Sequence, residues 1–153
     1  MNVISICQPH FLPWLGYFNM IYNSTNFIFL DDVQYNRRSW QNRVHILDNH
    51  NLQKKKLISL SVVDYHQKKR INEYKINKDN LDYLKQNFYQ SYNQSKYYSK
   101  ISDFIIDCVE KNINASLSEL NISLIKLVSR YLNLNLEYDR SSKINSDQKK
   151  EYL

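Results

Sequence analysis

Two short apolar runs near the start of the sequence constrain the fold most strongly. They span residues 3–7 (VISIC) and 27–31 (FIFLD), and Pro9 closely follows the first. The first run is typical of a buried strand that stops at the proline, and the second is typical of a strand buried on both faces of a parallel sheet. Between them, a helix is predicted by the spacing of Leu15, Phe18, Ile21 and Tyr22. Because a strand, helix, strand unit has a right-handed crossover, we expect both strands to end at the same edge of one sheet.

Weaker strand signals follow this unit. Residues 44–47 and 57–62 predict two strands that pair as a hairpin, joined by the polar connector of residues 48–56. The polar segment of residues 64–78 predicts a loop with one candidate strand at residues 74–76.

The second half of the chain has the apolar spacing of three helices. Asp79 is the candidate N-cap of the first helix, and Ser116 with Glu119 has the S-x-x-E spacing of a capping box before the third. Alternation of apolar and polar residues from Leu134 to Tyr138 predicts a further strand. The three apolar helix faces are marked by Leu81, Leu84, Phe88 and Tyr92, by Ile101, Phe104, Ile105, Cys108 and Val109, and by Leu117, Leu120, Leu124, Leu127, Val128 and Tyr131.

These patterns predict one α/β domain. The chain has 153 residues, of which 42% are apolar, so it is long enough for a single domain with a real core. We expect a small, mainly parallel sheet with an N-terminal strand, loop, helix and strand unit, followed by a three-helix segment. Residues 1–63 should bear the site, residues 79–132 should form the helical part, and residues 143–153 should form a polar tail.

Composition and charge exclude several classes of protein. The chain has no apolar run long enough to cross a membrane and no basic leader of a signal peptide, so we expect a cytoplasmic protein. Cys7 and Cys108 form no CxxC motif, which is typical of buried thiols in a reducing compartment. The net charge of +6 allows an anionic partner, although most basic residues lie in short, scattered clusters typical of solvated surface. The histidines form no metal-ligand pattern, and we expect neither a metal nor a cofactor.

Polar residues that can carry chemistry follow the first two predicted strands. His10 lies between the first strand and the helix, where a histidine can act as a general base, contact a phosphate or have a structural role. Gln8 can hydrogen-bond a sugar hydroxyl or an amide, or cap the loop. Asp31 and Asp32 are adjacent, so their side chains should point to opposite faces of the strand. One carboxylate can bind a metal, orient His10 or deprotonate an amine, and the alternative is an ion pair with a nearby arginine.

Arg37, Arg38 and Arg43 are the best candidates for an anion site. Guanidinium groups match the oxygen atoms of phosphate and carboxylate, so three of them in one turn favour an anionic ligand. Gln41 and Asn42 can add neutral hydrogen bonds. The alternative is that these arginines are solvated and bind no ligand, or that Arg37 or Arg38 pairs with one of the two aspartates.

The two tryptophans and the backbone-shaping residues complete this stretch. Tryptophan can stack on a sugar or a base, or can simply bury area. We predict that Trp14 belongs to the core, and that Trp40, which lies among polar residues, forms a wall of the site. Pro9, Pro13 and Gly16 are assigned to shaping the backbone, because proline fixes φ and glycine adopts conformations that other residues avoid.

Three motifs are recognisable in this order: a QPxxLPWxGYF loop, a DDVQY segment and an RRSWQNR turn. They are carried by Gln8 and Pro9, by residues 12–18, by residues 31–35 and by residues 37–43. Together they resemble the WbqC-like protein family, and the similarity continues through the LISLSVV and SLSELN segments, so that it covers essentially the whole chain. Family members usually continue into a further C-terminal part, so the resemblance implies that this chain is truncated.

The resemblance implies a role in the biosynthesis of lipopolysaccharide O-antigen or another bacterial surface polysaccharide. The implied activity is a transferase that moves an acyl or aminoacyl (glycine) group to a nucleotide-linked amino sugar. The alternative is a non-catalytic or inactive truncated domain that binds a phosphorylated ligand, and nucleic-acid binding is disfavoured because no recognition motif is present. The expected catalytic residues are His10, Asp31 and Asp32, and the expected substrate-binding residues are Gln8, Gln34, Tyr35, Arg37, Arg38, Trp40, Asn42 and Arg43.

Overall fold

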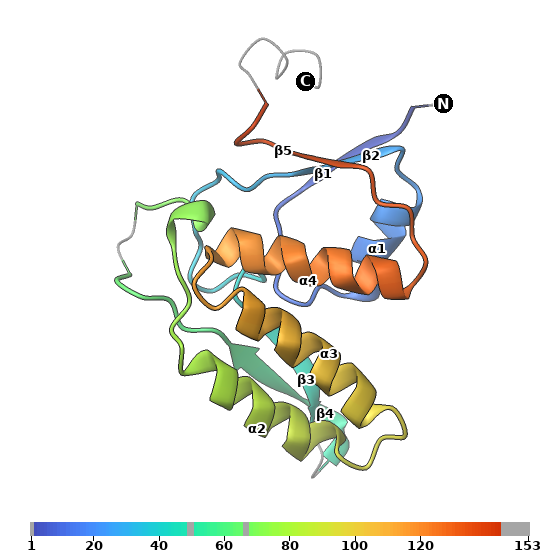
Figure 1. Ribbon diagram of the computed structural model, residues 1–153, viewed down its shortest axis with the longest axis vertical. Coiled ribbons are helices and arrows are strands. Elements are labelled where there is room, and N and C mark those ends of the chain that lie inside the picture. Colours follow the sequence, from blue (N-terminus) through green and yellow to red (C-terminus); the bar gives the residue numbers. More distant parts are fainter. Residues whose placement is uncertain (1, 49–50, 66–67, 145–153) are drawn as a thin grey trace.

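The sheet predicted near the N-terminus is present and parallel. The computed structural model describes residues 2–48, 51–65 and 68–144. In it, β1 (Ile4–Cys7) and β2 (Asn26–Phe29) flank α1 (Leu15–Tyr22) and pair in parallel, as predicted. A third strand, β5 (Tyr138–Arg140), pairs in parallel with β2, so that the strand order is β1-β2-β5 (Figure 1). The carboxyl ends of all three strands therefore lie at one edge of this sheet.

One face of this sheet packs on α1 and on α4 (Leu117–Tyr131), which lie on the same side of it in Figure 1. Phe27 and Phe29 of β2 are fully buried on that face. The core that they form with the two helices contains Tyr17, Phe18, Ile21, Ile122 and Ile125. Two residues counted in the predicted apolar face of α1, Leu15 and Tyr22, are exposed instead. This core therefore lies between the sheet and the two helices α1 and α4.

The predicted hairpin is also present, with one correction. It consists of β3 (Arg43–Asp48) and β4 (Asn51–Ser59), which pair in antiparallel fashion. The prediction that residues 48–56 form a connector is wrong, because most of them belong to the two strands. Lys55, for example, pairs with Leu47 across the hairpin. Backbone pairing between the strands therefore outweighs the low strand propensity of the lysine-rich sequence.

The chain between the hairpin and the first long helix is mostly irregular, as predicted. It contains the 3-10 helix η1 (Ile71–Glu73). The candidate strand at residues 74–76 forms only isolated bridges, in which Ile76 pairs with Val62. The second hairpin strand ends at Ser59 rather than at residue 62. In the same way, the strand predicted from Leu134 onward begins only at Tyr138, and Leu134 and Leu136 pack against the core below the sheet.

The three predicted helices are α2 (Asn80–Tyr92), α3 (Tyr98–Lys111) and α4. Ser116 and Glu119 form the predicted capping box, with Glu119 N donating to Ser116 Oγ at 3.2 Å and Ser116 N donating to Glu119 Oε2 at 3.0 Å. Asp79 occupies the N-cap position of α2, but its side chain makes no capping bond because its backbone is helical rather than extended. Within residues 2–48, 51–65 and 68–144, no helix is long and apolar enough to cross a membrane.

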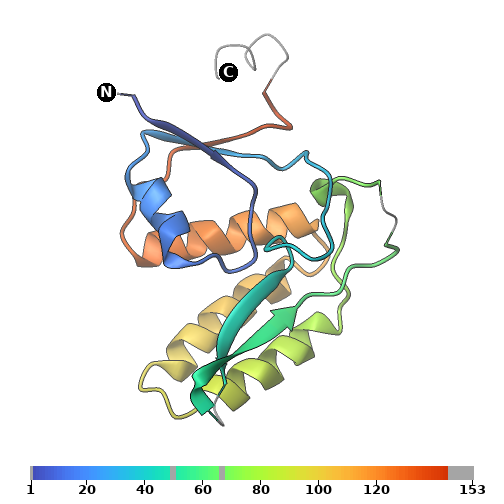
Figure 2. The same ribbon diagram turned by 180° about the vertical axis from the view of Figure 1, so that it is seen from behind.

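Helix α4 connects the two halves of the structure because it contributes to two cores. Ile122 and Ile125 face the sheet side, whereas Leu117, Leu120 and Leu124 belong to a larger core. That larger core lies among the hairpin, η1, α2, α3 and α4, and Figure 2 shows the hairpin in front of α2 and α3. The loops that follow β1 and β2 carry the candidate site residues, and both contact α4 at Asn121.

Candidate functional site

The two loops that carry the predicted site residues are joined by a pair of glutamine side chains. Gln8 follows β1, and Gln41 lies in the loop between β2 and β3 and is 1% exposed. Gln41 Nε2 donates to Gln8 Oε1 at 2.8 Å, and Gln41 Oε1 accepts from Asn36 N at 2.9 Å. Backbone pairing adds a second link, because Phe11 N donates to Trp40 O at 2.9 Å. Gln8 and Gln41 therefore hold the loops in position from within.

Asn121 of α4 supports both loops from below, and the sequence analysis did not identify it. Its side chain is fully buried, and its Nδ2 donates to Pro9 O at 2.9 Å and to Gln41 O at 2.7 Å. A polar residue beside Leu120 on an otherwise apolar helix face was the available signal, because a buried asparagine usually has backbone carbonyls to bind. Asn121 thus ties the site loops to the helix shared by both cores.

Five predicted residues meet at one open, polar cavity of about 760 Å³, which we call the arginine cavity. Arg37 lies over the ring of Tyr65, with its guanidinium carbon 5.4 Å from the ring centroid. Burial, with Tyr65 nearby, raises the pKa of Tyr35 to about 12, so its hydroxyl stays neutral at pH 7 and can donate a hydrogen bond. The cavity is lined by Gln8, Gln34, Tyr35, Asn36, Arg37, Arg38, Ser39, Gln41, Tyr65 and Lys68.

The arginine cavity is strongly basic. Within the described residues, Arg37 and Arg38 form no ion pair, since the ion pair found there joins Lys111 and Asp107. Lys68 adds a third cation from a segment that sequence analysis treated as solvated surface. Tyr65 and Lys68 lie far along the chain from the three motifs, so nothing in their local sequence marked them as part of a site.

A second cavity of about 560 Å³ lies beside the first helix, and we call it the tryptophan cavity. Trp40 forms part of its wall rather than of the arginine cavity, and its ring centroid lies 5.3 Å from that of His45. The prediction that Trp14 belongs to the core is contradicted, because this side chain is 71% exposed. The polar and aromatic residues that line the tryptophan cavity include His10, Trp14, Trp40, Arg43, His45 and Lys55.

Gly16 has a different role from the one predicted. Its backbone is helical and its φ is negative, so the position does not need the special conformational freedom of glycine. Instead, the indole of Trp14 lies directly over it, and a Cβ at position 16 would overlap that ring. The single glycine of the chain therefore leaves space for the Trp14 ring at the rim of the tryptophan cavity.

His10 lines the tryptophan cavity and not the arginine cavity. Its ring centroid lies 5.4 Å from that of Tyr17, and its Nδ1 atom is buried without a hydrogen-bond partner among the described residues. Burial lowers the pKa of His10, which favours the neutral imidazole at pH 7. A neutral ring can accept a proton, as the predicted role of general base requires.

The lowered pKa of His10 predicts a pH dependence of stability. The folded protein binds this proton less tightly than the unfolded chain, so the stabilisation is complete above the unfolded value of about 6.5 and is lost as the pH falls through the lowered pKa. Urea unfolding between pH 5 and pH 7 should show a smaller acid loss of stability in His10→Gln than in the wild type. His45→Gln is the control, because it retains His10. Equal acid losses in wild type and His10→Gln would contradict this assignment.

Arg43 and Asn42 lie at a smaller cavity of about 290 Å³ that also contacts Tyr35 and Arg37. Asn42 is buried, and its Nδ2 donates to Leu60 O at 2.8 Å, so its side chain holds the hairpin end in place. Arg43 lines both this cavity and the tryptophan cavity, and its Nε is buried without a partner among the described residues. The smaller cavity therefore shares Arg43 with the tryptophan cavity and shares Tyr35, Arg37 and Tyr65 with the arginine cavity.

Asp31 and Asp32 lie at the edge of the sheet that the sequence predicts, but their carboxylates accept hydrogen bonds from two serines. Asp31 is 2% exposed and accepts from Ser142 N at 2.9 Å and from Ser142 Oγ at 2.8 Å. Ser141 Oγ donates to Asp32 Oδ1. Both serines directly follow β5, whose carboxyl end is adjacent to that of β2. Neither aspartate lines any of the cavities described above.

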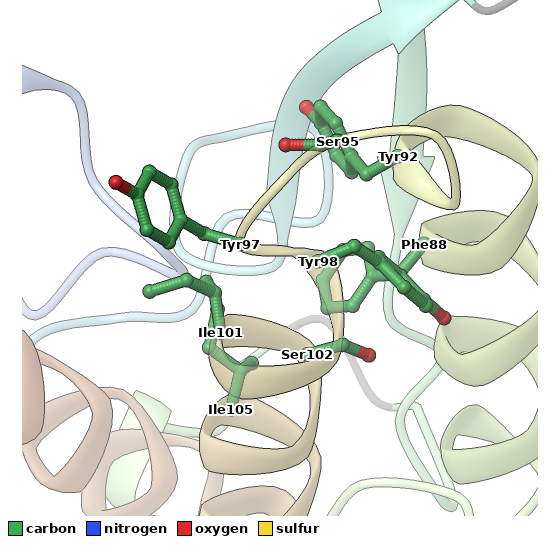
Figure 3. A pocket seen from close by; sticks show the side chains of 8 residues that line it. All are labelled: Phe88, Tyr92, Ser95, Tyr97, Tyr98, Ile101, Ser102 and Ile105. Carbon is green, nitrogen blue, oxygen red and sulfur yellow. The ribbon is translucent and has the colours of Figure 1, made fainter.

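A further cavity, of about 180 Å³, lies between the end of α2 and the start of α3 (Figure 3). It contains none of the predicted site residues, and aromatic and aliphatic side chains such as Phe88, Tyr98 and Ile105 surround it. Within the described residues, no group of His, Cys, Asp and Glu side chains is placed to hold a metal ion. Cys7 and Cys108 are free, and burial raises the pKa of both thiols.

The structure is an α/β fold in which the loops after β1 and β2 line two polar cavities. The chain belongs to the WbqC-like protein family, whose model matches residues 8–153. It is 30% identical over 141 residues to the uncharacterized protein Rv1507c of Mycobacterium tuberculosis (strain ATCC 25618 / H37Rv). The match covers 88% of this chain and 58% of that relative, so the chain spans less than two thirds of the relative's length. No solved structure matches.

Proposed function

We propose that this protein binds a nucleotide-linked amino sugar through its phosphates and transfers an acyl or aminoacyl group from an activated donor to the sugar amine, so that an amide bond forms, the donor's carrier group leaves and the amine proton passes to a base. The arginine cavity carries this proposal, because two guanidinium groups and one ammonium group line one open cavity and the arginines have no carboxylate partner among the described residues. Phosphate oxygens are the usual partners of such a cluster. The amides of Gln8 and Gln34 lie in the same cavity and supply hydrogen bonds suited to sugar hydroxyls.

The proposed role of general base falls to His10. It is the one member of the expected catalytic set that lines a cavity among the described residues, so the proposal requires the sugar amine to reach the tryptophan cavity, where the neutral imidazole can take its proton. Asp31 and Asp32 are given no catalytic role, because their carboxylates bind the serines after β5. Transfer to a nucleotide-linked sugar would place the protein in the cytoplasm, in the synthesis of O-antigen or another surface polysaccharide.

A second candidate function is binding of a phosphorylated ligand without catalysis. The observation that favours it is the division of the expected site: the arginines Arg37 and Arg38 line one cavity, whereas His10 lines another. A protein that only holds the ligand needs the first cavity and not the second. Incubation with a nucleotide-linked amino sugar and activated acyl donors, followed by mass spectrometry, separates the two functions, since only the transferase yields an acylated sugar.

Replacement of Arg38 by alanine tests the phosphate site. Isothermal titration with UDP-N-acetylglucosamine should show binding to the wild type and at least about tenfold weaker binding to Arg38→Ala, because a hydrogen bond to a charged group is worth about 1.5–3 kcal/mol. Arg130→Ala is the matched control, since Arg130 is an exposed arginine at the end of α4 and lines none of the described cavities. Equal affinities of Arg38→Ala and Arg130→Ala would remove the arginine cavity as the binding site.

A further inference from the structure

The tryptophan cavity combines three features that the proposed phosphate site does not use. Its walls include both tryptophans of the chain, its polar lining is basic, and buried nitrogen atoms of two lining residues have no hydrogen-bond partner in the part of the chain that the structure describes. At about 560 Å³ it falls within the range of about 300–1,000 Å³ that is usual for small-molecule sites. The cavity is therefore large enough to hold a ligand of its own.

The exposure of the two indoles indicates a planar partner. Trp14 is 71% exposed and Trp40 is 49% exposed, although tryptophan stabilises a fold mainly by burying its large ring. The position of Trp14 is also specified by the chain, because Gly16 is the residue that leaves room for the ring.

The polar lining indicates that the planar partner is an anion. Arg43 and Lys55 line the cavity, and none of the described aspartates and glutamates is part of its lining. Arg43 has a buried Nε without a partner among the described residues, and the same holds for Nδ1 of His10.

We propose that the tryptophan cavity is a second ligand site, which binds a planar aromatic molecule that carries a phosphate, the chemistry of a nucleotide. The aromatic ring stacks on Trp40 and Trp14, and the phosphate is held by Arg43 and Lys55. A donor of an activated acyl group that is built on a nucleotide has this chemistry. The inference itself does not depend on the ligand of the arginine cavity, because it rests on a different set of side chains.

The two tryptophans provide a direct readout. Because both of them line this cavity, the intrinsic tryptophan fluorescence of the whole protein reports on it alone. Adenosine monophosphate is the probe, and we expect saturable quenching of this fluorescence. Adenosine should bind more weakly because it lacks the phosphate, and inorganic phosphate should cause no quenching because it has no ring. Absence of saturable quenching by adenosine monophosphate would overturn the proposal.

Variants locate the binding. Trp40→Ala should weaken the binding of adenosine monophosphate about tenfold, since one stacked base is worth about 1–3 kcal/mol, and Trp14 remains as the reporter. Lys55→Gln, at an exposed strand position, should weaken the binding of adenosine monophosphate but not that of adenosine. Tyr22→Ala is the control, because Tyr22 is an exposed aromatic residue that lines none of the described cavities. Unchanged affinity in both Trp40→Ala and Lys55→Gln would overturn the proposal.

The two sites can fail separately. Arg38→Ala should leave quenching by adenosine monophosphate unchanged, whereas it should weaken the binding of UDP-N-acetylglucosamine measured by calorimetry. If Arg38→Ala abolished the quenching, the nucleotide would bind in the arginine cavity and the second site would be refuted. If Trp40→Ala failed to fold, as judged by circular dichroism, Lys55→Gln would decide the outcome, because its side chain is exposed.

Discussion

Asn121→Ala will lower the free energy of unfolding by about 3 kcal/mol. The substitution removes the donor to two buried carbonyls, Pro9 O and Gln41 O, and each buried acceptor left without a partner costs about 1–3 kcal/mol. The amide oxygen of Asn121 has no partner among the described residues, so its removal adds no further loss. Urea unfolding followed by circular dichroism measures the change.

A second substitution separates hydrogen bonding from packing at this position. Asn121→Asp keeps the size of the side chain but replaces the donor with a carboxylate that faces two carbonyl oxygens, so it should destabilise the protein at least as much as alanine. Asn114→Ala is the control, because Asn114 is an exposed asparagine in the turn before α4. If Asn121→Ala were as stable as Asn114→Ala, the proposed support of the loops by α4 would be wrong.

Asn121→Ala should also weaken ligand binding at both cavities. Pro9 lies between Gln8, which lines the arginine cavity, and His10, which lines the tryptophan cavity, while Gln41 lies next to Trp40. A loss of both carbonyl anchors therefore loosens both cavities together. Titrations of Asn121→Ala with UDP-N-acetylglucosamine and with adenosine monophosphate, at a temperature where the variant is folded, should show weaker binding of both.

Asp31→Ala will also lower the free energy of unfolding by about 3 kcal/mol. Its buried carboxylate accepts from the backbone and the hydroxyl of Ser142, and a hydrogen bond to a charged group contributes about 1.5–3 kcal/mol. These bonds fasten the chain after β5, which pairs with β2 over only three residues. Without them, we expect β5 to separate from the sheet before the rest of the structure unfolds.

Hydrogen exchange and chemical denaturation test this assignment together. Amide exchange in residues 138–142 should accelerate in Asp31→Ala more than exchange in α2, since the bonds to Asp31 lie at the sheet edge. Asp103→Ala is the control, because Asp103 is exposed on α3. A variant Asp31→Ala that kept the stability of the wild type but lost acyl transfer would show instead that this carboxylate is catalytic.

Much of the architecture could be predicted because it depends on short-range patterns. The runs VISIC and FIFLD became β1 and β2, helical spacing located four helices, and the capping box of Ser116 and Glu119 formed as its spacing indicates. The errors occurred where long-range pairing outweighed local preference. The lysine-rich segment joined β4 because β3 offered a partner, and residues 74–76 found only isolated bridges.

The candidate site was predicted less completely, for the same physical reason. Five expected site residues of the three motifs, Gln8, Gln34, Tyr35, Arg37 and Arg38, lie at one cavity in the structure. However, Lys68 and Tyr65 complete that cavity from a segment whose local sequence resembles a solvated loop. The exposure of Trp14 could not be inferred from its sequence. Trp14 is the N-cap of α1, and the burial of its ring depends on which side of the helix meets the core.

The sequence alone determined the elements and the membership in the WbqC-like family, because apolar periodicity, capping residues and rare motifs are local properties of the chain. Only the tertiary structure decided how the motif residues divide. His10 lines one cavity while Arg37 and Arg38 line another, and the parallel pairing of β5 with β2 brings Ser142 to Asp31. A residue's role in this protein therefore depends on partners more than 100 positions away, which no local pattern records.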